Sequence, residues 1–122
     1  MLGALHLLFT FCGERLFPRE PSLVARMKED SPKITRQTTV WRAGVGFHAS
    51  HSIGAILFGL VYGYLALVGP QFLFSSTFLL GLGLVYIVSM AILARVYWFS
   101  TPFQGIALST LLYAAGLAAS AA

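Results

Sequence analysis

The sequence predicts an all-α integral membrane protein, a single-domain up-down bundle of four transmembrane helices whose first helix is short. Hydrophobic residues make up 57% of the 122 positions and charged residues only 10%, compared with roughly 45–50% and about 25% in soluble domains. Eleven of the twelve charged residues lie between Glu14 and Arg42, and Arg95 is the only one in the 80 residues that follow. Because such a stretch cannot form a water-facing surface, it belongs in a bilayer.

Three apolar segments are long enough to cross the hydrocarbon core, which needs about 20 helical residues. The first ends at Gly69 and Pro70, a pair that stops a helix. The last begins with Thr101 as the expected N-cap and Pro102 at the first helical position. The three spans cover residues 41–68, 72–99 and 101–120.

The N-terminal residues 1–17 are predicted to form the fourth, short span. About a dozen residues precede Glu14 and Arg15, and at 1.5 Å per residue they cover roughly 18 Å of a core about 30 Å thick. The alternative is a re-entrant or interfacial helix.

A polar loop, residues 18–40, separates the first two spans. Ser22 is placed to cap a short amphipathic helix with Leu23, Val24 and Met27 on one side, which we expect to lie on the membrane surface.

The distribution of basic residues predicts the orientation in the membrane. Seven of the eight lie in or beside the polar loop, and none lies in the link 69–75. Lys and Arg accumulate on the cytoplasmic side, so the loop is expected inside and both termini outside, in the bacterial inner membrane. Tyr62 and Tyr64 fit an aromatic belt near the outer end of their span. The seven residues are Arg15, Arg19, Arg26, Lys28, Lys33, Arg36 and Arg42.

Most soluble functions are excluded by the same pattern. The basic residues are explained by orientation, so no nucleic-acid partner is expected. The lone Cys12 excludes an intrachain disulfide and a CxxC metal motif. Apart from Glu14, which is expected to reach the lipid headgroups, no carboxylate lies within the spans. This excludes a di-iron carboxylate centre and argues against hydrolysis by paired carboxylates. Nucleophile and phosphate-loop motifs are absent from the sequence. We therefore expect no catalytic residues and no enzymatic activity.

Small residues recur at four-residue steps along the span 41–68. Such stripes let two helix backbones approach closely, because lipid supplies no hydrophobic force to join helices. The stripe therefore predicts packing inside the chain's own bundle or against another subunit. The residues assigned to this role are Gly46, Ser50, Gly54, Ala55, Gly59 and Gly63.

Three histidines, His6, His48 and His51, are the ionisable groups of interest within the spans, where such groups are costly and face protein or a cavity. Counted at 1.5 Å per residue from Glu14 and Arg42, all three lie about 9–13 Å deep. They could therefore form one polar layer with hydroxyl groups at similar depths. Its other members would be Ser50, Ser52, Tyr86, Ser89 and Ser109.

Three interpretations of this layer remain open. Hydrogen bonds could join the helices, each contributing about 0.6 kcal/mol in lipid. A pocket between helices could bind a lipid, a quinone or another hydrophobic molecule. Haem would require His6 opposite His51, and zinc would require three converging nitrogens. We expect no cofactor, with haem or a metal as the alternative.

The segment 34–41 and the elements that follow it, Gly46-Phe47, Ser50-His51-Ser52, Gly54, Phe58-Gly59 and Tyr62-Gly63, resemble small uncharacterised four-helix membrane proteins of bacteria. The resemblance covers about the first 65 residues and depends mainly on the tryptophan, Gly-Phe and Ser-His-Ser elements. It implies the fold and the location, and suggests a longer first helix in relatives. It transfers no catalytic residue, because these proteins carry no assigned activity.

These observations predict a small non-enzymatic accessory or structural subunit of a larger membrane protein complex. Its partners would be membrane lipids and other membrane protein subunits, contacted through the small-residue helix faces. The alternative is a bundle with an internal site at His6, His48 and His51 that binds haem, a metal or a hydrophobic ligand such as a quinone or lipid.

Overall fold

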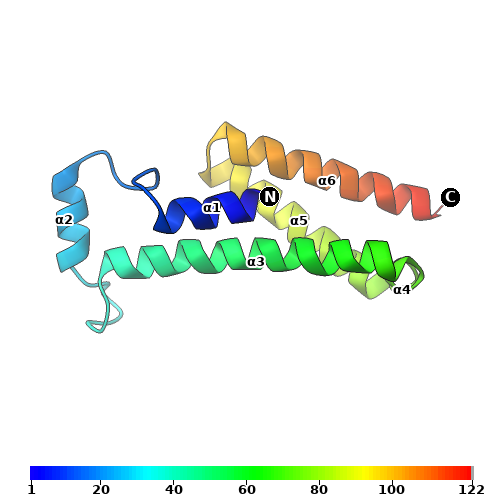
Figure 1. The fold of residues 1–122 in the computed structure, drawn as a ribbon, viewed down its shortest axis with the longest axis horizontal. Coiled ribbons are helices and arrows are strands. Elements are labelled where there is room, and N and C mark those ends of the chain that lie inside the picture. Colours follow the sequence, from blue (N-terminus) through cyan, green and yellow to red (C-terminus); the bar gives the residue numbers. More distant parts are fainter. Residues whose placement is uncertain (122) are drawn as a thin grey trace. The chain divides into compact units, whose positions relative to one another are not determined.

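The computed structural model describes residues 1–121 as six helices without a strand. They divide into two compact units, a first unit of Met1–Phe58 and a second unit that begins at Gly59. The long third helix runs through both. In chain order (Figure 1) the helices are α1 (Leu2–Phe11), α2 (Pro21–Glu29), α3 (Val40–Val68), α4 (Pro70–Ser75), α5 (Thr77–Tyr97) and α6 (Ser100–Ala121).

Three of these helices, α3, α5 and α6, are long and apolar enough to cross a membrane. Their mean hydropathies are 1.7, 2.3 and 1.3. The shortest, α5, has 21 residues and a length of about 31 Å, which matches the hydrocarbon core. The all-helical fold is therefore confirmed, and three helices are compatible with membrane spans by length and composition. The assignment to one domain stays a prediction.

The predicted first span over residues 1–17 is not confirmed, so three spans are found where four were expected. Helix α1 has ten residues and ends at Phe11, a length of about 15 Å. Cys12 follows in an extended conformation, and Gly13 has a φ of +84°. A left-handed glycine directly after the C-cap ends a helix, so Glu14 and Arg15 are not carried on it.

The expected short helix in the polar loop is present as α2. Pro21 occupies its first position and Glu20 the N-cap position, so Ser22 lies inside the helix rather than capping it. The Ser22 hydroxyl instead donates to the carboxylate of Glu20.

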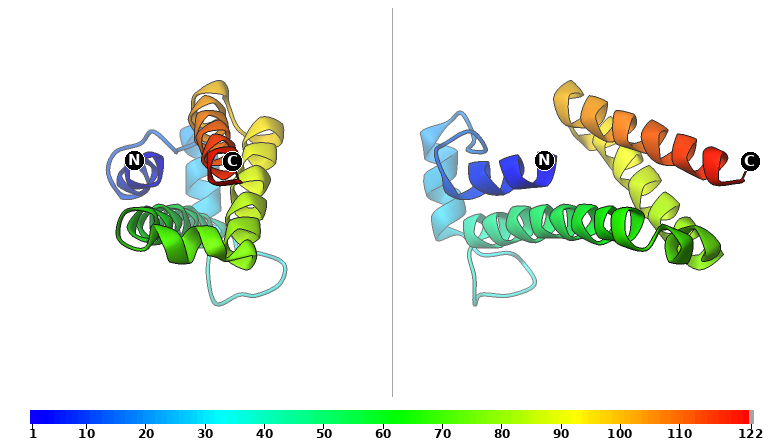
Figure 2. Two further views of the ribbon diagram at one scale, coloured as in Figure 1. Left: turned by 90° about the vertical axis from the view of Figure 1, so that its right-hand side faces the viewer. Right: turned by 45° about the vertical axis from the view of Figure 1, so that its right-hand side comes forward.

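The connection from α2 to α3 is closed by a backbone hydrogen bond in which the Val40 nitrogen donates to the Asp30 oxygen at 2.9 Å. Thr39 then caps α3, because its hydroxyl oxygen accepts from the Arg42 nitrogen at 3.3 Å. In the first unit α2 lies across the beginning of α3 (Figure 2).

Helices α1 and α3 lie side by side in the first unit, and the close approach depends on Gly3 (Figure 2). A Cβ atom at Gly3 would lie 3.0 Å from the Ser52 oxygen and 3.1 Å from both Ala55 Cβ and Ile56 Cγ1. Ser52 is fully buried at this contact. The beginning of α1 therefore meets the middle of the 29-residue α3.

In the second unit, α3 stops at Val68 as predicted, before Gly69 and Pro70. The predicted helix 72–99 is two helices, because α4 ends at Ser75 and α5 begins at Thr77. Ser76 separates them and caps α5, its hydroxyl oxygen accepting from the Leu79 nitrogen at 3.3 Å.

Helices α5 and α6 pack against each other as neighbours in the chain. Helix α6 begins at Ser100, one residue before the predicted cap Thr101. The guanidinium of Arg95, in the last turn of α5, lies 5.7 Å from the centre of the Phe103 ring of α6. Leu73, Ile87 and Ala94 are the buried apolar residues of this unit.

Candidate functional site

The structure brings together the three histidines that the sequence singled out, in what we call the histidine cluster. His6 on α1 lies between His48 and His51 on α3. Its Nε2 atom is 3.3 Å from Nδ1 of His48, a hydrogen bond in which either ring can donate. The ring centres of His6 and His51 are 5.9 Å apart, with the planes almost perpendicular. Their role in binding a ligand stays a prediction.

Hydroxyl groups around the cluster bond to their own helices. Ser52 donates to the His48 oxygen at 2.9 Å, and Thr10 donates to the His6 oxygen at 2.8 Å. Ser50 donates to the Phe47 oxygen at 2.9 Å and is exposed. These bonds satisfy the hydroxyl donors within one helix turn. The hydrogen bond between His6 and His48 joins α1 to α3 here.

The other expected members of the polar layer lie on the second unit. Tyr86 and Ser89 are on α5, and Ser109 is on α6. The Ser109 hydroxyl donates to the Gly105 oxygen at 2.9 Å, one turn back on its own helix. A layer shared by four helices thus stays a prediction.

The three histidines do not form a metal site. Within residues 1–121, no three His, Cys, Asp or Glu side chains are arranged to hold a metal ion. The rings of His6 and His51 lie 5.9 Å apart between centres, with almost perpendicular planes. The haem and hydrophobic-ligand interpretations of the cluster stay predictions.

A hollow beside the cluster, which we call the interfacial pocket, has a volume of about 310 Å³. This value lies at the low end of the range for ligand sites, about 300–1,000 Å³. The ring of Phe17 meets that of Trp41 at 4.5 Å between centres, and the Lys28 ammonium lies 5.4 Å from the centre of the Trp41 ring. The pocket is lined by Thr10, Leu16, Phe17, Pro18, Met27, Trp41, Gly44, Val45 and His48.

A second polar arrangement, in the second unit, joins three helices around Gly83 of α5. Tyr62 of α3 donates to the Leu79 oxygen at 2.8 Å, and Tyr113 of α6 donates to the Leu80 oxygen at 2.9 Å. A Cβ atom at Gly83 would lie 2.6 Å from Tyr62 Cε1 and would also collide with the hydroxyl of Tyr113. The absence of a side chain at Gly83 therefore lets both tyrosines reach the α5 backbone.

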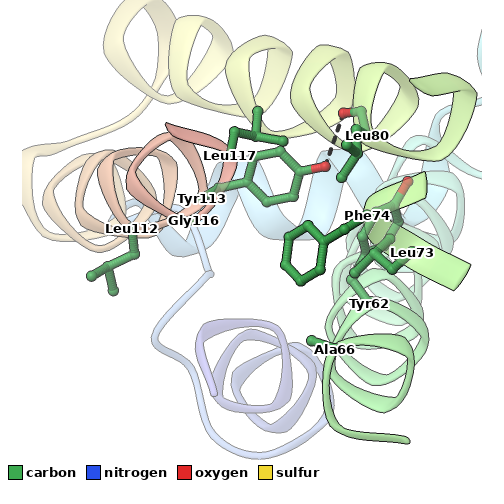
Figure 3. A pocket seen from close by; sticks show the side chains of 9 residues that line it. All are labelled: Tyr62, Ala66, Leu73, Phe74, Leu80, Leu112, Tyr113, Gly116 and Leu117. Atoms are coloured by element: carbon green, nitrogen blue, oxygen red, sulfur yellow. Dashed lines mark hydrogen bonds between the residues drawn. The ribbon is translucent and has the colours of Figure 1, made fainter. Parts of the chain in front are cut away.

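These tyrosines border an apolar hollow of about 140 Å³ (Figure 3). Its volume falls below the usual range for ligand sites, so we interpret it as a packing defect. Gly83 and Tyr113 were not predicted from the sequence. Tyr62 and Tyr64 were both expected in an interfacial belt. Tyr62 packs against α5, and Tyr64 is exposed.

The predicted packing stripe on α3 is mostly open. A Cβ atom at Gly46, Gly54, Gly59 or Gly63 would meet no atom of the described chain within 4 Å. Ala55 differs, because its Cβ faces Gly3 of α1. Gly59 and Gly63 are four residues apart and share one face of the helix, which we call the open face of α3.

Comparison with known proteins gives no match to a protein-family model, a curated protein or a solved structure. The likeness to small bacterial four-helix membrane proteins therefore stays a prediction. Function is inferred from the geometry of the chain.

Proposed function

We propose that the protein is a small non-enzymatic accessory subunit of a larger membrane protein complex and that it docks through the open face of α3. The observation that carries this proposal is the empty space at Gly59 and Gly63, which share one face of α3. In lipid, helices associate through close van der Waals packing at small residues. A transmembrane helix of a partner can approach the α3 backbone along these glycines.

The division of the chain between membrane and loop supports a structural role. Helices long enough to span a membrane make up most of residues 40–121, and the polar segment 12–39 carries one short helix. No separate catalytic domain is formed by the described residues. Helices α1 and α3, which carry the histidine cluster, contain no carboxylate.

We further propose that the basic loop faces the cytoplasm of a bacterium and that the C-terminus lies outside its inner membrane. The seven basic residues around the loop support this orientation. Helix α1 would enter the membrane from the loop side as a fourth, partial span, because Gly3 reaches only the middle of α3.

Substitutions on the open face test the docking proposal. Gly59→Leu and Gly63→Leu should release the partner from the purified complex, because each adds a bulky side chain where a second helix approaches. Gly81→Leu and Gly116→Leu are matched controls, since these glycines are also open but lie on α5 and α6.

The measurements are the mass of the complex in mild detergent and the helix content by circular dichroism. Loss of the partner in the α3 variants alone, with unchanged helix content, supports docking through the open face. Equal loss in the control variants would contradict it.

The second candidate function is a binding site for a hydrophobic ligand at His6, His48 and His51. It is favoured by the meeting of the three rings beside the interfacial pocket. An absorbance spectrum and a metal analysis of the purified protein test its cofactor forms. A Soret band that is lost in His51→Ala would establish haem. A colourless, metal-free protein would exclude the haem and metal forms and leave a hydrophobic ligand as the remaining form of this function.

A further inference from the structure

The interfacial pocket lies where the apolar helices meet the basic segment of the chain. Thr10 belongs to the last turn of α1, Trp41 to the first turn of α3, and Met27 to the amphipathic α2. Helix ends of this kind, with tryptophan at the boundary, lie at the level of the lipid headgroups. The pocket therefore opens at the depth where the acyl chains of the surrounding lipids begin.

The pocket wall is suited to hydrocarbon. Aromatic and aliphatic side chains form most of it, including the Phe17 and Trp41 pair and Val45. The hydroxyl of Thr10 is engaged by the His6 oxygen. At about 310 Å³, the hollow suits a single chain rather than a bulky ring system.

Basic side chains lie in the same segment of the chain as the apolar wall of the pocket. Residues 14–42 hold seven basic and four acidic side chains, a net charge of +3. Lys28 lies over the ring of Trp41, which is itself part of the wall. Its ammonium makes this ring contact and no ion pair within residues 1–121. A cation without a carboxylate partner, beside an apolar hollow at a membrane boundary, is complementary to an anionic amphiphile.

We propose that the interfacial pocket binds one acyl chain of an anionic phospholipid, whose phosphate is met by Lys28. This inference gives a ligand class to the second candidate function and does not depend on docking through the open face of α3. An uncharged quinone would gain no electrostatic binding energy from Lys28. A protein helix is too wide for the hollow.

Quenching of Trp41 fluorescence by brominated lipid tests the proposal. In a Trp98→Phe background Trp41 is the only tryptophan, and bromine on an acyl chain quenches it on contact. The protein is placed in phosphatidylcholine nanodiscs that contain a small fraction of brominated phosphatidylglycerol or of brominated phosphatidylcholine. We expect the phosphatidylglycerol to occupy the pocket with a preference of about fivefold, the order expected for one lysine near a phosphate.

Two pairs of variants separate charge from shape. Lys28→Gln should remove the preference, whereas Lys33→Gln, another exposed lysine of the same loop, should keep it. Gly44→Leu should fill the pocket and reduce quenching by both lipids. Gly46→Leu is its control, because Gly46 is also open but does not line the pocket.

Equal quenching by the two brominated lipids would overturn the proposal, as would quenching that Gly44→Leu leaves unchanged. The quenching of Trp41 reports on the pocket in the first unit and not on docking at Gly59 and Gly63, so its outcome is independent of the accessory-subunit proposal. A pocket filled by an uncharged ligand would show as weak quenching by both lipids and would also overturn it.

Discussion

In each unit a glycine lets two helices approach closely, but the polar side chains that bond between the helices differ. Around Gly83, the hydroxyls of Tyr62 and Tyr113 donate to backbone carbonyls of α5. In the first unit, His6 of α1 forms a hydrogen bond with His48 of α3, and His48 remains exposed beside a hollow.

This difference separates a structural contact from a candidate binding site. Polar side chains in a membrane are stabilised by internal partners or by a ligand or water-filled cavity. The tyrosines of the second unit have internal partners on the neighbouring helix, and so do His6 and His48, which bond to each other. The first unit combines a histidine cluster with an adjacent hollow, and it is where we place the lipid.

The largest expected effect is the loss of stability caused by Gly83→Val. Its side chain would overlap both tyrosines, and overpacking costs about 1–3 kcal/mol, with about 0.6 kcal/mol more for each hydrogen bond lost. The free energy of unfolding in detergent measures it. The matched control is Gly81→Val on the same helix, where a Cβ meets open space. An equal loss in the control would show that helix propensity, rather than the tyrosine contact, is responsible.

A smaller loss is expected for Gly3→Val in the first unit. Its Cβ would lie 3.0–3.1 Å from atoms of α3, so the neighbours must shift slightly, at a cost of about 1 kcal/mol. Hydrogen exchange of the α1 amides should become faster, because α1 is held by this contact. Gly46→Val, which adds the same side chain in open space, should leave the exchange of α1 unchanged. If it accelerates exchange equally, the contact at Gly3 is not what holds α1.

The smallest effects are expected for Tyr62→Phe and Tyr113→Phe. Each removes one hydrogen bond to α5, at a cost of about 0.6 kcal/mol, while the ring that packs on Gly83 is kept. Unfolding free energies of the two single variants and the double variant measure both bonds and any coupling between them. Tyr64→Phe, on an exposed residue of the same helix, should cost nothing measurable. A comparable loss of unfolding free energy in Tyr64→Phe would show that the hydrogen bonds of Tyr62 and Tyr113 to α5 are not responsible for the effect.

Much of the fold could be predicted because charge and hydropathy act locally along a chain. The confinement of charge to residues 14–42 and the stop at Gly69 and Pro70 located the long helices. The early end of α1 was missed, because a glycine that adopts a positive φ looks the same in sequence as a helical one. Gly13 is the first kind and Gly3 the second.

The candidate site was predictable to the extent that depth in the membrane could be counted. Equal depths indicated that His6, His48 and His51 could meet, and they do. Contacts that depend on tertiary packing could not be counted in this way. Gly83 becomes significant only when tyrosines from two other helices reach it.

The most direct test of the central claim, an accessory subunit in a larger complex, is the mass of the purified protein in lipid nanodiscs. If the protein is such a subunit, the 13.2 kDa chain will be found together with a different membrane protein at a fixed ratio. A monodisperse 13.2 kDa monomer, or a simple multiple of that mass, would contradict it.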